Sequence, residues 1–406
     1  MRKIKKYITL FLLILYISAS SALCYNVPFI LGTLLLLGIW ASKKYSRQDN
    51  IIVFIIGYFL IVDIISCLYT GDSFRITRVF NYLYPILIAY FCLKICGRDT
   101  FRMLEKIVYV LTILSLVIFG LQLLFPTLFE RLSSSFSVFL AAPYLERDPS
   151  SWYAFIYRYM PRDNYSDMVR NCGFMWEPGA FAWILVMMLF YRWLSSGIKL
   201  KDKRTIVYII GIITTFSTAG YLALFCIVFL YAYHVRASFG KYLLIILLLM
   251  YIIPVMYNLD FISNKIESYF ISNQEGSYGY HTETGTVEYN RYMFSLYALF
   301  EILHFPIGYG THEITTPEGL PLISPNGLAK ILYHWGIMGF CFFVYALYRF
   351  YQNLNRNNKW LDGVIATVAI CILLFSNPAH ANPLVFLLVL YPFMFKKQIN
   401  ESCCIV

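Results

Sequence analysis

Ile51-Ile-Val-Phe-Ile-Ile-Gly-Tyr-Phe-Leu-Ile-Val-Asp-Ile-Ile-Ser-Cys-Leu-Tyr-Thr70 is an uninterrupted apolar stretch with one charged side chain, Asp63. About 20 such residues, wound as an α-helix, cross the hydrocarbon core of a bilayer. The stretch therefore predicts a transmembrane helix. Since a lone charge at that depth is costly, we expect Asp63 to pair with Arg75 or Arg78, which follow the stretch.

Similar apolar runs recur along the chain. Of the 406 residues, 59% are hydrophobic and 14% charged, and the mean hydropathy is +0.63, which excludes an ordinary water-soluble globule. The runs leave no room for a separate soluble domain, so residues 1–406 are predicted to form one integral membrane domain. We expect an all-α polytopic membrane protein with about 12 transmembrane helices. The predicted spans are 7–24, 27–42, 51–70, 79–94, 107–126, 175–194, 205–216, 218–235, 242–258, 326–348, 362–376 and 383–395.

The charges between the spans predict their orientation. With the N-terminus in the cytoplasm, 23 of the 33 basic residues but only six acids fall on the cytoplasmic side. Basic residues concentrate on the cytoplasmic side of membrane proteins, so both termini are expected to be cytoplasmic. The net charge of +11 is then a topology signal, and a nucleic-acid partner is not expected.

Three local features bear on this topology. Thr214-Thr-Phe-Ser-Thr-Ala-Gly220 interrupts a long apolar run with basic flanks, which predicts two short helices meeting at a break. The N-terminus resembles a secretory signal peptide, but its apolar run is long, so we expect an uncleaved helix. Cys403–Val406 matches the pattern of a prenylation site, and we interpret it as part of a short cytoplasmic tail.

Two long loops, 127–174 and 259–325, fall on the outer side, where we expect the function to reside. The second contains 291–304, whose spacing of apolar residues predicts an amphipathic helix at the membrane interface. Arginine predominates over lysine among the outer cations. Its planar guanidinium pairs in bidentate fashion with phosphate or carboxylate, although pairing with nearby acids such as Asp163 and Asp167 is an alternative.

A pair of charges enters the sixth predicted span. Arg170-Asn-Cys-Gly-Phe-Met-Trp-Glu-Pro-Gly-Ala-Phe-Ala182 brings Arg170 and Glu177 to the edge of a hydrophobic helix. Ionisable groups at membrane depth suggest a functional site. An interfacial salt bridge that only anchors the helix is the alternative.

These motifs together resemble a known family. Arg170…Gly173…Glu177-Pro178, the Thr215-Phe-Ser217 break, and Arg291…Pro306-Ile-Gly-Tyr-Gly310…Asn326…Gly336-Ile-Met-Gly339 resemble the Wzy-type O-antigen and capsular polysaccharide polymerases. The resemblance extends from about residue 75 onward and rests on the combination of short motifs.

The resemblance implies a glycosyltransferase of the bacterial cytoplasmic membrane with its active site facing outward. Such enzymes polymerise undecaprenyl-diphosphate-linked oligosaccharide repeat units without a cofactor or an obvious metal, and a chain-length regulator is a candidate partner. Arg170 and Arg291 are then expected to contact the diphosphate and Glu177 to act as base. Glu301, His304 and His312 are competing bases. Further substrate-binding candidates are Arg75, Arg78, Arg158, Arg162, Tyr309, His312 and Asn326.

Three other functions remain open. An O-antigen ligase would share fold and donor but deliver the glycan to a lipid A core; such ligases commonly carry a His-Asn pair where this chain has Ser324-Pro-Asn326. A flippase or transporter for lipid-linked oligosaccharides would explain the broken segment 205–235. A membrane scaffold without chemistry is the fourth possibility.

Overall fold

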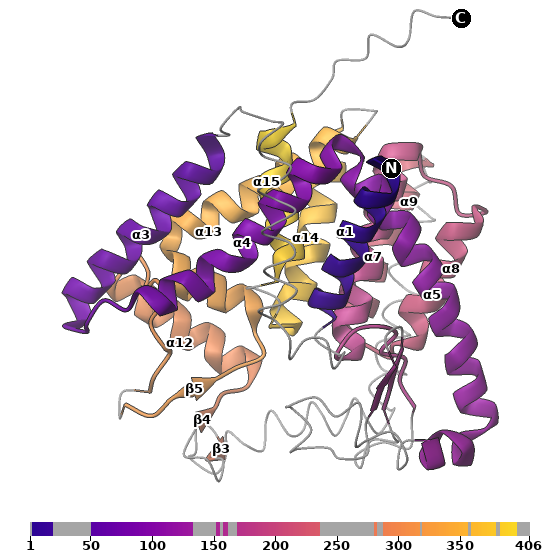
Figure 1. Ribbon diagram of the computed structural model, residues 1–406, viewed down its shortest axis with the longest axis horizontal. Coiled ribbons are helices and arrows are strands. Elements are labelled where there is room, and N and C mark those ends of the chain that lie inside the picture. The colour runs from indigo at the N-terminus through magenta and orange to yellow at the C-terminus, as the bar shows by residue number, and fades with distance from the viewer. Residues whose placement is uncertain are drawn as a thin grey trace, which may run out of the picture.

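The computed structural model describes most of the chain as helix (Figure 1). Predicted spans 27–42 and 242–258 lie outside the described residues. Elsewhere, each predicted span overlaps an observed helix. The described residues are 2–18, 50–132, 152–154, 157–160, 169–235, 280–281, 287–316, 319–355, 359–378 and 382–395.

Four segments of the described chain are long and apolar enough to cross a membrane. They are α3 (Asn50–Thr70); Ile76–Leu124, which comprises α4 (Ile76–Cys96), the 3-10 turn η2 (Gly97–Asp99) and α5 (Thr100–Leu124); α7 (Pro178–Ser196); and α13 (Gly327–Leu354). The shorter apolar helices are α9 (Thr218–His234), α14 (Trp360–Ser376) and α15 (Pro383–Met394). The remaining helices are α1 (Arg2–Ile17), α8 (Lys203–Thr214) and α12 (Arg291–His304).

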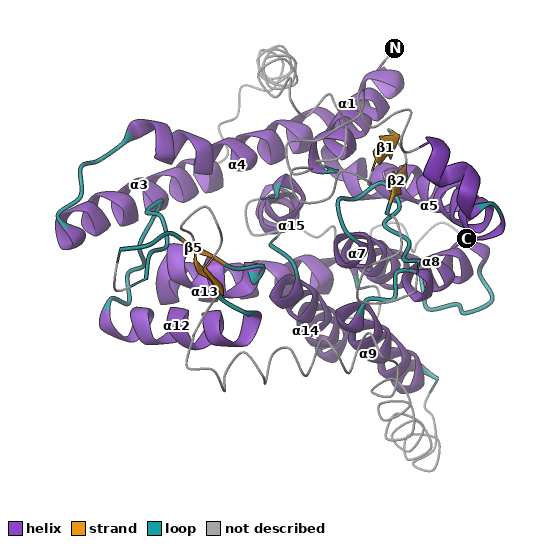
Figure 2. Ribbon diagram, turned by 90° about the horizontal axis from the view of Figure 1, so that it is seen from below, coloured by secondary structure: helices purple, strands orange, loops and turns teal. Residues whose placement is uncertain are grey.

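Helix α7 is the centre of the fold. Its side chains from Ala180 to Phe190 are fully buried, and it packs against α5, α8, α9, α13 and α14 (Figure 2). A helix that is apolar on all sides is stable only when covered on all sides. By contrast, α3 exposes Phe54, Ile61 and Leu68, an apolar face of the kind that contacts lipid.

The predicted break between the two short helices is confirmed. Helix α8 ends at Thr214 and α9 begins at Thr218. Between them Phe216 has a φ of 47°, a left-handed conformation that stops a helix. The Ser217 hydroxyl then caps α9 by accepting a hydrogen bond from the backbone N–H of Gly220.

Two small sheets were not anticipated by the all-α prediction. In the first predicted outer loop, β1 (Trp152–Ala154) and β2 (Tyr157–Tyr159) pair antiparallel. In the second, β3 (Tyr280–His281) pairs antiparallel with β4 (Val287–Glu288), which runs parallel to β5 (Leu322–Ile323). Figure 2 shows β5 beside α12 and α13, so these strands fold the loop against the helices.

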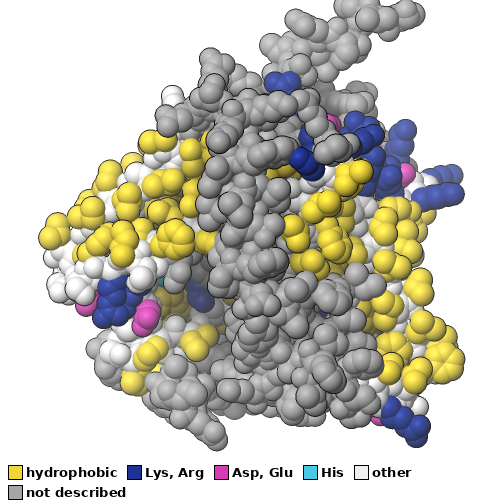
Figure 3. Space-filling view, in the orientation of Figure 1, with side chains coloured by type: hydrophobic (Ala, Val, Ile, Leu, Met, Phe, Trp, Pro, Cys, Tyr) yellow, Lys and Arg dark blue, Asp and Glu magenta, His cyan; other side chains and the backbone are white. Residues whose placement is uncertain are grey.

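Basic side chains gather at one end of the molecule, at the upper right of Figure 3. At the connection between α7 and α8, Arg192 and Arg204 form ion pairs with the buried carboxylate of Glu105, and Asp202 pairs with Arg192. The end of α7 and the starts of α5 and α8 meet at this connection, whereas the start of α7 and the end of α8 meet at the opposite end of these helices (Figure 1). Among the described candidate site residues, Arg170 and Glu177 lie at that opposite end, before and at the start of α7.

Candidate functional site

The segment before α7 is held in place by a fully buried asparagine. Asn171 Oδ1 accepts hydrogen bonds from Ser115 Oγ of α5 at 2.8 Å and from the Gly173 backbone at 2.9 Å. Asn171 Nδ2 donates to Thr214 Oγ1 at 3.0 Å, and the Asn171 backbone N–H donates to the Thr214 carbonyl. One side chain therefore ties the segment to α5 and to the end of α8.

Gly173 allows the chain to turn from this anchor into α7. Its φ is +54°, and a Cβ at this position would lie 2.6 Å from the ring of Phe181, one turn into α7. Only glycine combines that backbone conformation with so close an approach. The glycine of this motif is therefore required by the turn into α7 and by the contact with Phe181.

Arg170 reaches across to the broken segment between α8 and α9. Its guanidinium donates to the carbonyl oxygens of Thr215 at 3.4 Å and Phe216 at 3.2 Å. These carbonyls belong to the break, where the helical hydrogen-bond ladder is interrupted. Two of the sequence motifs, Arg170 and Thr215-Phe-Ser217, therefore form one structural unit.

Three charged groups surround the buried thiol of Cys172. Burial raises the pKa of this thiol to about 12; the charges of Arg158 and Arg170 act to lower the pKa, and that of Glu177 acts to raise it. The Arg158 backbone N–H also donates to the Gly173 carbonyl at 2.7 Å, which joins β2 to the segment. Arg158, Arg170 and Glu177 are thus all close enough to Cys172 for their charges to act on its thiol.

Glu177 occupies the N-cap position of α7 with extended backbone (φ −152°, ψ 158°), but its side chain does not cap the helix. Pro178 fills the first turn, where a missing N–H is tolerated. The carboxylate is half-buried at the start of the central helix. The carboxylate is therefore not used to cap α7.

Arg291 reaches the same region from α12. Its Nε donates to the carbonyl of Ser376, at the end of α14, at 3.1 Å. The next residue, Asn377, packs against α7: a Cβ on Gly179 would lie 2.7 Å from Asn377 Oδ1. Arg291 is therefore linked to the first turn of α7, two residues from Glu177, through the end of α14.

Asn326 is fully buried and has a structural function. Its Nδ2 donates to the Arg291 carbonyl at 2.9 Å and to Ser295 Oγ at 2.7 Å, while its Oδ1 accepts from the Ala329 backbone N–H. It caps α13 and anchors the start of α12. These contacts place its side chain against the backbone of Arg291.

The block 306–310 inserts into a break in α13. At Gly336 (φ 67°, ψ −177°) the helix is non-helical, and a Cβ there would meet the Ile307 carbonyl. Tyr309 N–H donates to the Tyr333 carbonyl, Gly310 N–H to the His334 carbonyl, and Ile337 N–H to the Pro306 carbonyl, at 2.9–3.0 Å. The loop thus replaces the lost helical hydrogen bonds, as buried backbone N–H and C=O groups require.

Tyr309 is held by the same packing. Its ring stacks on Tyr333 with centroids 4.5 Å apart, and its hydroxyl donates to Glu301 Oε2 at 2.6 Å. Burial and the Glu301 carboxylate raise the pKa of Tyr309, so the hydroxyl stays protonated.

Asp63 does not pair with Arg75 or Arg78 as the sequence suggested. Its Oδ1 accepts two hydrogen bonds from Thr311, from the backbone N–H at 2.8 Å and from the hydroxyl at 2.6 Å. Gly310 brings the loop against α3: a Cβ there would lie 2.7 Å from Asp63 Oδ1. Thr311, directly after the block 306–310, bonds this carboxylate in place of an arginine.

The remaining candidates are spread around this loop. Arg75 is exposed at the start of α4, and Arg78 forms a 3.8 Å ion pair with Glu313. His304 is exposed on α12, where its Nδ1 bonds the Phe300 carbonyl at 2.9 Å. His312 is buried and bonds Asp72 and Cys67. Arg162 lies outside the described residues.

The structure thus brings seven of the described candidates into two groups. Arg158, Arg170 and Glu177 form the first, to which Arg291 is linked through α14; Arg78, Tyr309 and His312 belong to the second, beside α3. Sequence reasoning missed Asn171, Asn377 and Thr311, which position these groups. Polar residues beside a predicted span were the available signal, but their partners are distant in sequence.

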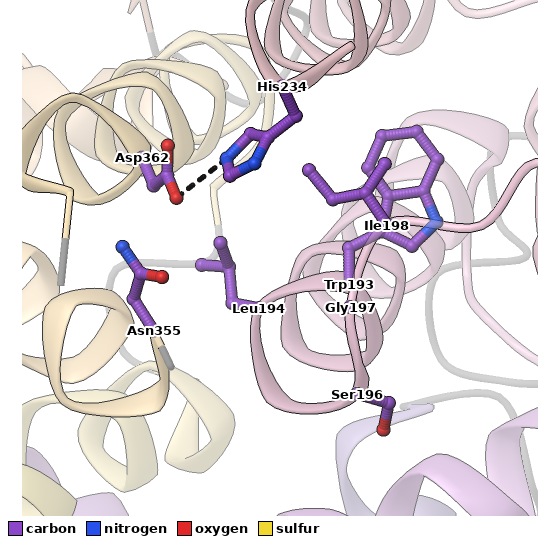
Figure 4. Close-up of a pocket in the computed structure, with 8 residues that line it drawn as sticks. All are labelled: Trp193, Leu194, Ser196, Gly197, Ile198, His234, Asn355 and Asp362. Carbon is purple, nitrogen blue, oxygen red and sulfur yellow. Dashed lines mark hydrogen bonds and ion pairs between the residues drawn. The ribbon is translucent and has the colours of Figure 1, made fainter. Parts of the chain in front are cut away.

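A cavity of about 130 Å³ lies between the end of α7, α9 and α14 (Figure 4). It is lined by Trp193, Asn355, and the hydrogen-bonded side chains of His234 and Asp362, whose Nε2 and Oδ2 atoms lie 2.8 Å apart. None of the predicted site residues lines this cavity. Among the residues that the structure describes, no group of three or more His, Cys, Asp or Glu side chains is arranged to hold a metal ion.

The chain matches no protein-family model, and no curated protein matches its sequence.

Proposed function

We propose that this chain polymerises lipid-diphosphate-linked oligosaccharides at the outer face of the bacterial cytoplasmic membrane, as its resemblance to the Wzy-type polymerases implies. The proposal includes about 12 spans with both termini in the cytoplasm. One observation carries it: Arg291, more than 100 residues from Arg170 and Glu177 in sequence, is linked through the end of α14 to the start of α7, where that pair lies.

The chemistry matches these groups. In the transfer, an acceptor sugar hydroxyl attacks the anomeric carbon of the donor sugar, the bond from that carbon to the diphosphate oxygen breaks, and the lipid diphosphate leaves. Arg170 and Arg291 would stabilise the developing negative charge, since fixed cations favour the transition state where charge appears. Glu177 would take the proton of the attacking hydroxyl.

The helical framework supports such a use of Arg170. Its two hydrogen bonds to carbonyls fix the direction of the guanidinium, which has five N–H donors. A positioned cation needs little reorganisation when charge develops. Arg158, whose charge also acts on Cys172, would add a further positive charge for the phosphate.

The test uses purified protein in liposomes and a single synthetic lipid-linked repeat unit. We expect a ladder of chain lengths from the wild type and a loss of about 100-fold or more in rate for Glu177→Gln and for Arg291→Lys. Glu130→Gln and Arg349→Ala, at exposed residues away from the groups above, serve as matched controls. Full polymerisation by the Glu177 and Arg291 variants would refute the proposal.

A transporter of lipid-linked oligosaccharide is the second candidate function. Both the α8–α9 break and the Gly336 break in α13 favour it, because interrupted helices are common at transporter binding sites. The same liposomes distinguish the two: movement of a labelled lipid between leaflets, without elongation of its glycan, would identify a transporter. Transfer to lipid A core without a ladder would instead identify a ligase.

A further inference from the structure

Cys67, His312 and Asp72 form a linear arrangement at the end of α3. Cys67 Sγ lies 3.4 Å from His312 Nε2, and His312 Nδ1 lies 3.1 Å from Asp72 Oδ2. The three residues come from the last turn of α3, the α3–α4 connection and the loop after 306–310. We propose that Cys67 is a nucleophile that accepts an acyl group from an activated ester or thioester on an apolar chain, with His312 as its general base.

The hydrogen bonds are arranged in the order that this role needs. Because the Asp72 carboxylate can only accept, His312 Nδ1 carries the proton and Nε2 presents a lone pair to the thiol. A nucleophile, a base and a group that orients the base, each within reach of the next, are the signature of covalent catalysis. The arrangement is not that of a metal site, since the acid and the thiol contact opposite nitrogens of the ring.

The inserted loop makes the imidazole rigid. His312 is only 6% exposed, and its backbone N–H donates to the Tyr309 carbonyl at 3.1 Å. The neighbouring Thr311 is bound to Asp63, one turn before Cys67 on the same helix. The base is therefore fixed to the helix that carries the nucleophile, and little ordering is required during the attack.

The thiol needs a base in order to react. A thiol becomes a strong nucleophile only when its proton is removed. Arg78, a cation shortly after α3, forms its ion pair with Glu313 at 3.8 Å. The proton must therefore leave as sulfur attacks, and His312 Nε2 is placed to take it.

The surroundings indicate the class of acyl donor. Cys67 is partly exposed, and Ile64 and Leu68 on the same helix are 49% and 80% exposed. Phe74 and Ile76, just after the helix, are exposed as well. An apolar chain lying on this face would bring its carbonyl to the thiol. Sulfur attacks that carbonyl carbon, the bond to the leaving oxygen or sulfur breaks, and the thiol proton passes through His312 to the leaving group.

The test is acylation by p-nitrophenyl octanoate of the protein in detergent micelles. We expect a stoichiometric burst of p-nitrophenolate and a hydroxylamine-sensitive octanoyl adduct at Cys67, located by mass spectrometry. Cys67→Ser should abolish this thioester, His312→Gln should slow the burst about 100-fold, and Asp72→Asn about 10-fold. Asp72 is 61% exposed, so its replacement leaves the fold intact.

Cys341 supplies the control, because it is an exposed thiol on α13. Cys341→Ser should keep the full burst. Equal acylation of Cys341 and Cys67, or a burst rate unchanged by both His312→Gln and Asp72→Asn, would overturn the proposal. The dependence of the burst rate on pH distinguishes a general base from a packing role. If His312 is the base, the rate should follow the titration of an imidazole in the wild type and that of a thiol in His312→Gln.

Discussion

Replacing Gly336 by alanine tests the joint between α13 and the inserted loop. The residue has φ 67° and ψ −177°, a conformation that is nearly exclusive to glycine and costs other residues about 1–3 kcal/mol. A Cβ would also lie 2.6 Å from the Pro306 carbonyl oxygen and contact that of Ile307, so the loop must move away. Gly336→Ala therefore combines backbone strain with displacement of the loop.

The displacement threatens three hydrogen bonds. They join Ile337 to Pro306, Tyr309 to Tyr333, and Gly310 to His334. Each contributes about 1 kcal/mol net, and more if its carbonyl is left unsatisfied in the bilayer. With the strain, we expect Gly336→Ala to lower the free energy of unfolding by about 4 kcal/mol.

The assay is unfolding by sodium dodecyl sulfate in mixed micelles, followed by tryptophan fluorescence. Gly57→Ala is the matched control: this glycine lies within α3, and a Cβ there would meet nothing within 4 Å. Since alanine is the better helix former by up to about 1 kcal/mol, Gly57→Ala should be neutral or stabilising. If Gly336→Ala unfolded together with the control, the inserted loop would not support α13.

Three further predictions use the same assay. Asp202→Asn should lower the free energy of unfolding by about 1 kcal/mol at pH 7. The Arg192 hydrogen bond lowers the pKa of Asp202 in the folded protein, so this stabilisation is complete above the ordinary aspartate pKa near 4. The difference from wild type should disappear as the pH falls below about 4 and through the lowered pKa. A difference that persists in acid would contradict this. Glu105→Gln should cost about 2 kcal/mol, because it leaves the partly buried Arg204 without its 2.6 Å ion pair; restoration of stability by a second change, Arg204→Met, would support the pairing, and no restoration would argue against it. Asn326→Ala should cost about 3 kcal/mol, one for each hydrogen bond of its side chain, and a loss below 1 kcal/mol would show that these bonds are dispensable.

Much of the fold could be predicted from the pattern of apolar residues. The predicted spans 51–70 and 362–376 differ from α3 and α14 by no more than two residues at either end, and the amphipathic segment 291–304 coincides with α12. The Thr214–Gly220 break was predicted because a continuous helix would reverse the charge pattern. These features depend on the length and composition of a single segment, which the sequence displays directly.

The partners of the polar residues could not be predicted in this way. Asp63 was expected to bind an arginine nearby in sequence, yet it binds Thr311. The side chain of Asn326, a substrate-binding candidate, caps α13 and also bonds Arg291 and Ser295 of α12. In both cases a partner distant in sequence is brought close by the packing of several helices. A sequence shows which polar side chains in apolar segments need a hydrogen-bond partner, but it does not show which residue is that partner.

The amino-acid sequence by itself determined that this chain forms apolar helices with basic residues gathered toward one end, because burial in lipid and charge asymmetry act on each segment separately. Only the tertiary structure decided that the 306–310 loop fills the break in α13, and that Arg291 is linked to the start of α7, where Arg170 and Glu177 lie. The physical reason is that hydrogen bonds are short and directional. They form between whichever groups helix packing brings within about 3 Å, whatever their separation along the chain.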